Sequence, residues 1–73
     1  MEKTVKVIPK NRVQEIRVEL KEFKGHNIID IRIWNTVPNS DEKRPTTKGV
    51  TMNVELLPEL KEAVELLDKE LSE

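Results

Sequence analysis

Cysteine is absent from the sequence, histidine occurs once, and serine occurs only as Ser40 and Ser72. Without cysteine no disulfide can brace the fold, and one histidine with scattered carboxylates does not supply the ligand cluster that zinc or copper needs. A Ser-His-acid site would have to combine His26 with Ser40, and no spacing in the sequence requires that pairing. A glycine-rich phosphate loop is missing as well. We therefore expect no enzyme, no metal site and no cofactor.

Long apolar runs are missing too. The amino terminus reads MEKTVKVIPK, in which charges interrupt every apolar stretch, so it predicts neither a secretory signal nor a membrane span. We expect an intracellular protein, in the cytoplasm and nucleoid or in the nucleus of a eukaryote, with no membrane partner.

The short length limits the hydrophobic core. Residues 1–73 are expected to form a single domain, and a monomer of this size buries only roughly 60% of the surface that its unfolded chain exposes. With no disulfide or metal to compensate, association with a second copy is the expected way to complete the core. We predict a homodimer.

The net charge of −1 hides an asymmetry along the chain. Residues 1–48 contain eleven Lys and Arg against seven Asp and Glu, whereas residues 49–73 contain two against seven. A basic first half favours contact with a polyanion, although opposite halves can equally attract each other within the fold or between copies.

Alternating residues predict two long strands in the first half of the chain. IRVELK, residues 16–21, alternates apolar and charged side chains, and IIDIRIW puts three isoleucines on one face and Asp30, Arg32 and Trp34 on the other. KGHN, between them, predicts a tight reversal around Gly25. TVKVI and the turn PKN predict an edge strand and turn within residues 1–12.

The second half predicts a loop, a short strand and a helix. Residues 35–47 have two prolines and no apolar period, which indicates a loop, and residues 48–52 alternate as a fourth strand. Asn53 occupies the position of a helix cap, and Pro58 indicates that the helix begins irregularly or at Pro58 itself. Apolar residues then repeat at spacings of three and four: Leu57, Leu60, Val64, Leu67 and Leu71. The expected fold is α+β, a four-stranded antiparallel sheet followed by one carboxy-terminal helix.

The two aromatic residues, Phe23 and Trp34, lie near basic residues on neighbouring predicted strands. Single-stranded nucleic acids are held by basic grooves with aromatic rings, on which each base stacks with about 1–3 kcal/mol. The structural interpretation is that Phe23 caps the core at the hairpin and Trp34 covers a sheet edge or a dimer contact. The pattern alone leaves both interpretations open.

EFKGHNIIDIRIW, followed after a polar loop by TKGVTMN and a helix, resembles the carboxy-terminal domain of the positive cofactor four family of transcriptional coactivators. Members read very nearly as a hydrophobic strand, F-K-G-K, I-D-I-R with an aromatic residue after it, a loop rich in Lys and Pro, K-G-I-S-L and a helix opening with Asn. The resemblance extends over residues 16–67. It implies a homodimer whose concave sheet surfaces bind single-stranded or melted DNA with little sequence preference, in transcription, replication or repair.

The resemblance also implies a site. Phe23 matches the stacking position in the hairpin, and Trp34 matches the aromatic after I-D-I-R. The basic positions that approach the DNA backbone, and the glycines that shape the turns, are matched by Lys24, Arg32, Lys48, Gly25 and Gly49. His26 stands where a lysine is usual, and Arg44 is a basic residue of the polar loop. RNA is a further candidate ligand, and RNA polymerase or transcription factors are candidate partners.

Some family features are missing. Asn35 replaces a second aromatic that many members carry, and the long serine-rich amino-terminal region of eukaryotic members is absent. The chain therefore resembles the compact prokaryotic or phage members.

Two other functions remain open at this point. The helix with its leucine repeat is also typical of a dimeric interaction module that docks on the transcription machinery, and Trp34 buried against that helix would favour this function. A strand followed by an Asn-capped helix also faintly resembles a duplex-binding repressor, but that fold requires a second helix.

Overall fold

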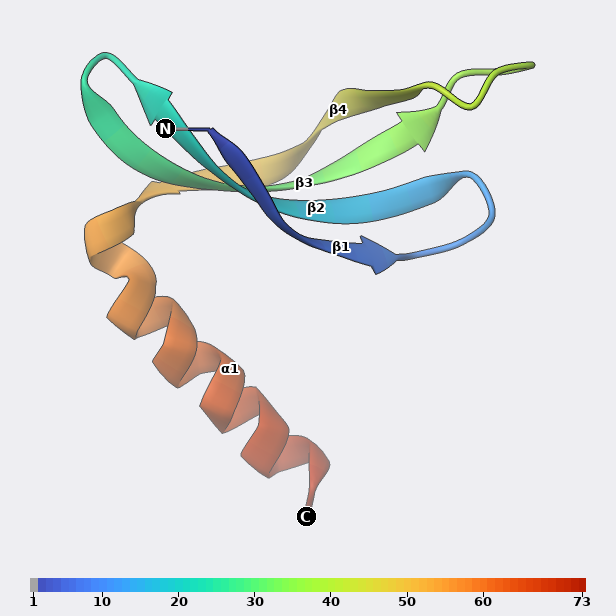
Figure 1. Ribbon diagram of the computed structural model, residues 1–73. Helices are drawn as coiled ribbons and strands as arrows, with labels where there is room; N and C mark the ends of the chain where they lie inside the picture. The colour runs from blue at the N-terminus through green and yellow to red at the C-terminus, as the bar shows by residue number, and fades with distance from the viewer. Residues whose placement is uncertain (1) are drawn as a thin grey trace.

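The computed structural model describes residues 2–73, which form one antiparallel sheet followed by a helix (Figure 1). The elements are β1 (Lys3–Pro9), β2 (Gln14–Phe23), β3 (His26–Thr36), β4 (Lys43–Asn53), the 3₁₀ turn η1 (Val54–Leu56) and α1 (Leu57–Leu71). The strands neighbour one another in chain order, each antiparallel to the next. The predicted β-β-β-β-α architecture is confirmed.

A short loop joins the edge strand β1 to β2, as the PKN turn predicts. The Asn11 side chain organises this loop, since its Oδ1 accepts hydrogen bonds from the backbone N–H groups of Val13 at 3.0 Å and Gln14 at 2.9 Å. An asparagine that bonds to the backbone two and three residues onward is a common turn device. The predicted edge strand is confirmed and extends from Lys3 to Pro9.

A two-residue turn joins β2 to β3. Lys24 and Gly25 both have positive φ, 52° and 80°, and this combination defines the turn whose twist matches that of the flanking strands. Gly25 adopts such a φ without a steric penalty, whereas Lys24 has a Cβ that disfavours it. The turn places Phe23 directly opposite His26. The predicted reversal is confirmed.

The fourth strand begins earlier than expected. Residues 35–47 were predicted to be loop, but β4 starts at Lys43 and only the segment between Thr36 and Lys43 is a turn. Proline is tolerated at Pro45 because β4 is an edge strand, in which one side of the backbone has no strand partner. Since an exposed edge needs no apolar alternation, the hydrophobic pattern does not reveal this part of the strand.

A bulge interrupts β4 and leaves β3 regular. Arg32 is opposite Gly49 and Trp34 is opposite Pro45, so the extra residues are in β4. The register of β3 with β2 is unbroken from end to end. A bulge re-aims the side chains of the strand that contains it, and Trp34 therefore stays on the face of Arg32 and Asp30, as predicted.

The helix begins irregularly, as Pro58 indicates. The 3₁₀ turn precedes α1, and Pro58 is at the second helical position, where a missing N–H breaks no helical hydrogen bond. Asn53 precedes η1, but its side chain makes no capping hydrogen bond. Asn53 therefore marks the boundary of the helical region without capping it.

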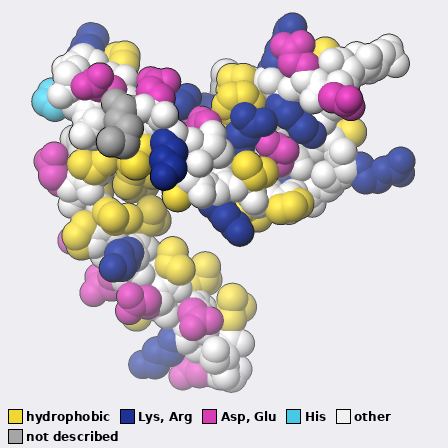
Figure 2. Space-filling view, in the orientation of Figure 1, with side chains coloured by type: hydrophobic (Ala, Val, Ile, Leu, Met, Phe, Trp, Pro, Cys, Tyr) yellow, Lys and Arg dark blue, Asp and Glu magenta, His cyan; other side chains and the backbone are white. Residues whose placement is uncertain are grey.

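Hydrophobic burial within this single chain is minimal. Ile29 is the only buried hydrophobic residue among residues 2–73, and none of the residues of α1 is buried. The helix extends away from the sheet (Figure 1), and hydrophobic side chains gather where α1 meets the sheet and along α1 itself (Figure 2). No helix within the described part of the chain is long and apolar enough to cross a membrane.

Candidate nucleic-acid interface

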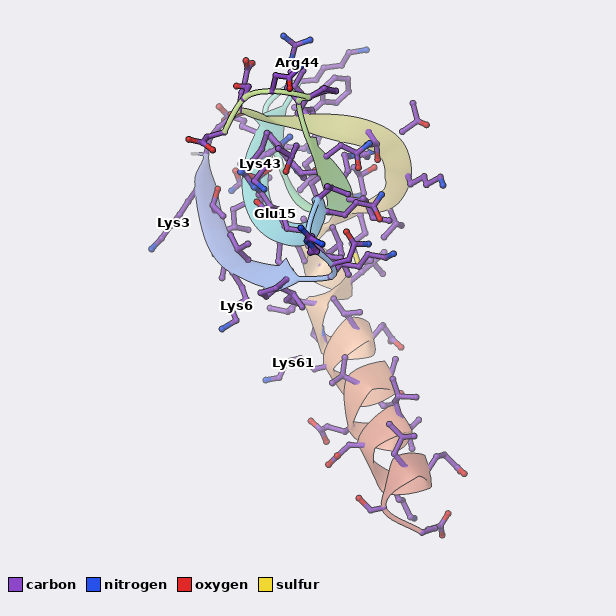
Figure 3. The ribbon with its side chains drawn as sticks, turned by 90° about the vertical axis from the view of Figure 1, so that its right-hand side faces the viewer. Lys3, Lys6, Glu15, Lys43, Arg44 and Lys61 are labelled. Carbon is purple, nitrogen blue, oxygen red and sulfur yellow. The ribbon has the colours of Figure 1, made fainter. Side chains whose placement is uncertain are left out.

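The sheet has an apolar face and a polar face. On the two central strands the apolar face carries Ile16, Val18, Leu20, Ile29, Ile31 and Ile33. The opposite face, called the polar face below, carries Glu15, Arg17, Glu19, Lys21 and Phe23 on β2 and His26, Ile28, Asp30, Arg32 and Trp34 on β3. Glu15 and Lys43 lie inside the curve of the sheet, whereas Lys3 and Lys6 project outward from β1 (Figure 3). The polar face is therefore the concave one.

A buried carboxylate forms the centre of the polar face. Asp30 is 1% exposed, and its Oδ1 accepts hydrogen bonds from Arg32 Nη2 at 3.0 Å and Arg32 Nε at 3.2 Å. Lys21 Nζ lies 3.5 Å from Asp30 Oδ2 and 3.6 Å from Glu19 Oε1. Burying a charge is costly unless it is paired and hydrogen-bonded. Asp30 meets both conditions, so Arg32 and Lys21 are partly neutralised within the fold.

Arg32 also joins β3 to the bulge of β4. Its Nη1 donates a hydrogen bond of 2.9 Å to the Thr46 carbonyl oxygen, while the Thr46 hydroxyl donates one of 2.8 Å to the Ile33 carbonyl. At Gly49 the two strands approach so closely that a Cβ atom would lie 2.7 Å from the Ile31 carbonyl oxygen and 2.9 Å from Arg32 Cα. The expectation that Gly49 shapes a turn is wrong: Gly49 lies within a strand, where the close approach of the Arg32 backbone leaves no room for a side chain.

Trp34 pairs with an arginine on the polar face. The Arg17 guanidinium lies 4.0 Å from the centroid of the Trp34 ring, and Arg17 Nε donates a 2.5 Å hydrogen bond to Glu15 Oε2. Lys43 Nζ lies 3.8 Å from the other Glu15 oxygen. Trp34 is half-buried, and its indole N–H is shielded from solvent with no hydrogen-bond partner among residues 2–73. The Trp34 ring is therefore on the polar face and packs against Arg17.

Phe23 is the exposed ring of the polar face. It lies at the end of β2 with 60% of its surface accessible, and Lys24 Nζ is 5.3 Å from the ring centroid. His26 is opposite Phe23 on β3 and is also exposed. The turn therefore brings together four of the residues predicted for the site, Phe23 to His26.

The remaining predicted basic residues are more dispersed. Arg44 is near the start of β4 (Figure 3), with its side chain 67% exposed and Arg44 Nε 3.3 Å from Glu42 Oε2. Lys48 is in the β4 bulge and borders a shallow hollow with residues of the apolar face, Ile16, Ile31 and Ile33. The structure thus brings Arg32 and Trp34 onto one face and places Lys48 beside the other. Their roles in binding stay predictions.

Three further cations of the polar face were not assigned to the site from the sequence: Arg17, Lys21 and Lys43. The alternation of IRVELK places Arg17 and Lys21 on the polar side of the strand. Nothing in that pattern indicates that Arg17 meets Trp34, because this contact depends on how β2 and β3 align. No group of three or more metal-binding side chains occurs in the described part of the chain.

Comparison of the sequence with models of known protein families gives a match. Residues 10–63 match the model of the Transcriptional Coactivator p15 (PC4) family. The chain belongs to the PC4 family. The match includes β2, β3, β4 and the first turns of α1, so the family resemblance read from EFKGHNIIDIRIW is confirmed.

Solved structures of PC4 homologues have the same fold. The orthorhombic crystal structure of a PC4 homologue from Burkholderia pseudomallei is similar with a TM-score of 0.84 at 26% identity, covering 93% of this chain and 90% of that one. A bacteriophage T5 homologue of PC4, described as implicated in recombination-dependent DNA replication, is similar with a TM-score of 0.80 at 23% identity, covering 97% and 81%. Comparison with curated protein sequences finds no significant match.

Proposed function

We propose that this PC4-family chain is a homodimeric single-stranded DNA-binding protein that acts without catalysis and with little sequence preference, in transcription regulation or in replication or repair. The ligand would lie along the polar face, between the Phe23–His26 turn and the Trp34 end of β3. RNA polymerase or transcription factors are candidate partners of the DNA-bound protein.

The observation that carries this proposal is the exposed Phe23 ring on a concave, charged face. A large ring in the core would be covered, whereas Phe23 keeps 60% of its surface accessible beside the Lys24 ammonium. A base can stack on such a ring while the neighbouring cation attracts the phosphate. The T5 homologue's description, which links that protein to DNA replication, agrees with this class of ligand.

The surface area of the chain supports the homodimer. The single chain exposes 6077 Å², whereas a compact monomer of its mass exposes about 4,700 Å². The excess of about 1,400 Å² per chain corresponds to an interface of about 2,800 Å², within the range of obligate homodimers. Exposed leucines of α1 such as Leu67, and the half-buried apolar face of the sheet, supply the apolar surface that a second copy would cover.

The location of Trp34 argues against the interaction module as the primary function. That alternative predicts Trp34 buried against α1, but Trp34 lies on the polar face and contacts Arg17. A duplex-binding repressor of the strand-and-two-helix type is also disfavoured, because α1 is the only α-helix among residues 2–73.

Fluorescence anisotropy tests the ligand. Labelled oligo-dT, an RNA of equal length and a duplex are titrated at several salt concentrations, and we expect the single-stranded DNA to bind most tightly, with an affinity that falls steeply as salt rises. Phe23→Ala should weaken binding by about 5- to 150-fold, the loss expected for one stacked base. Val13→Ala, at a similarly exposed apolar residue in the β1–β2 loop, is the matched control. Equal affinity for duplex, or a Phe23→Ala variant that binds like the wild type, would refute the proposal.

Light scattering tests the dimer. The wild type should have twice the mass of one chain, and Leu67→Glu should shift it toward the monomer because the new carboxylate would be buried in the interface. Lys69→Glu introduces the same side chain two residues away, outside the leucine repeat, and should leave the dimer intact. A wild-type monomer at micromolar concentration contradicts this part of the proposal.

A further inference from the structure

Arg17 has an unusual set of contacts on the polar face. Its Nε is bound to Glu15 and its guanidinium is stacked on the Trp34 ring. No described residue accepts a hydrogen bond from its two terminal nitrogens, Nη1 and Nη2, although the side chain is only 23% exposed. The guanidinium is therefore held in one orientation while its outer donors stay unused.

The other cations of the polar face are engaged differently. Arg32 uses both terminal nitrogens within the fold, Nη2 on Asp30 and Nη1 on the Thr46 carbonyl. Lys21 Nζ lies between two carboxylates, and Lys43 Nζ donates to the Thr36 hydroxyl at 2.7 Å and faces Glu15. Of the two arginines on the central strands of this face, only Arg17 has terminal nitrogens, Nη1 and Nη2, with no hydrogen-bond acceptor among residues 2–73.

A guanidinium that is held in one orientation with its terminal N–H groups unused is suited to bind a phosphodiester. Two parallel N–H groups match the two oxygens of a phosphodiester, which a lysine ammonium binds only as a point charge. An arginine that is already held by an aromatic ring and a carboxylate loses less rotational freedom on binding than a mobile side chain does. A ligand phosphate would therefore meet donors that are oriented before it arrives.

We propose that Arg17 binds a backbone phosphate of the single strand and that Trp34 is the positioning residue that holds Arg17 in place. This inference rests on the proposed function and assigns Trp34 a role different from base stacking. Arg17 covers one face of the ring, so a base could stack there only after Arg17 had left. Glu15 completes the arrangement by fixing Arg17 Nε.

A double-mutant cycle on oligo-dT binding tests this assignment. Arg17→Ala should weaken binding by about tenfold or more and lower the magnitude of the slope of log K against log salt by about 0.7, the value for one lost phosphate contact to a single strand. Arg17→Lys keeps the charge, so it should keep the slope and still lose affinity. Arg12→Ala, in the β1–β2 loop, is the control for removal of an arginine elsewhere, and thermal unfolding verifies that each variant is folded.

Trp34→Leu separates positioning from stacking. If Trp34 acts through Arg17, Trp34→Leu weakens binding by itself but adds no further loss to Arg17→Ala. Fully additive losses would overturn the positioning role, and an Arg17→Ala variant with wild-type affinity and slope would overturn the phosphate contact. A wild type that does not bind oligo-dT would instead refute the proposed function itself, so the two failures are distinguishable.

Discussion

Removal of the Arg32 side chain should lower the free energy of unfolding far more than removal of any exposed arginine side chain. Arg32→Ala leaves Asp30, which is 1% exposed, with Lys21 Nζ at 3.5 Å as its remaining charge partner. Loss of one partner from a buried ion pair typically costs about 3–5 kcal/mol, and Lys21 moderates the effect toward the lower end. The Thr46 carbonyl also loses its 2.9 Å hydrogen bond, a further contribution of about 1 kcal/mol. We therefore expect a loss of about 3–4 kcal/mol.

Thermal unfolding measures this loss. For a domain of 60–100 residues about 4–8 °C of Tm corresponds to 1 kcal/mol, so Tm should fall by roughly 12–30 °C at fixed protein concentration. Arg44→Ala is the matched control, because the Arg44–Glu42 pair is exposed and such pairs contribute about 0–1 kcal/mol. Adding Asp30→Asn to Arg32→Ala removes the buried charge that has lost its arginine partner and should recover part of the stability. If the free energies of unfolding of Arg32→Ala and Arg44→Ala differ by less than about 1 kcal/mol, the account of Asp30 as a buried, paired charge is wrong.

Two further substitutions test the backbone geometry around the site. Gly49→Ala should cost about 1–3 kcal/mol in urea unfolding, because its Cβ would lie 2.7 Å from the Ile31 carbonyl oxygen. Gly25→Ala meets no atom within 4 Å, so its cost of about 1–2 kcal/mol should come from the positive φ alone. A Gly49→Ala variant as stable as the wild type would contradict the close approach of β3 and β4. Asparagine tolerates the positive φ of 52° at position 24 better than lysine does, so Lys24→Asn should keep or raise Tm. The same substitution removes one cation and should weaken oligo-dT binding. Unchanged binding would remove Lys24 from the interface.

Sequence patterns predicted the central strands well because these strands have one apolar and one polar face. The alternation in IRVELK and IIDIRIW predicted which side chains share a face, Trp34 among them, and the unbroken register of β2 and β3 confirms it. The pattern failed at residues 43–47, which belong to an edge strand with no alternation to detect. The alternation correctly placed Gly49 in a strand; the turn-shaping role came from the family resemblance, whereas Gly49 is required because β3 lies too close for a side chain.

The sequence by itself determined the order of elements, the chemistry of each face and the small number of apolar side chains available for a core, because these follow from local periodicity and composition. Tertiary structure alone decided which cations remain available to a ligand. Arg17 and Arg32 both lie on the polar face. The terminal nitrogens of Arg32 donate hydrogen bonds to Asp30 and Thr46, whereas Arg17 packs on Trp34 and its terminal nitrogens have no acceptor among residues 2–73. The Arg32–Asp30 and Arg17–Glu15 pairs each lie within one strand. The difference therefore comes from the contacts between strands, Arg32 with Thr46 and Arg17 with Trp34, which strand register, the β4 bulge and sheet curvature set.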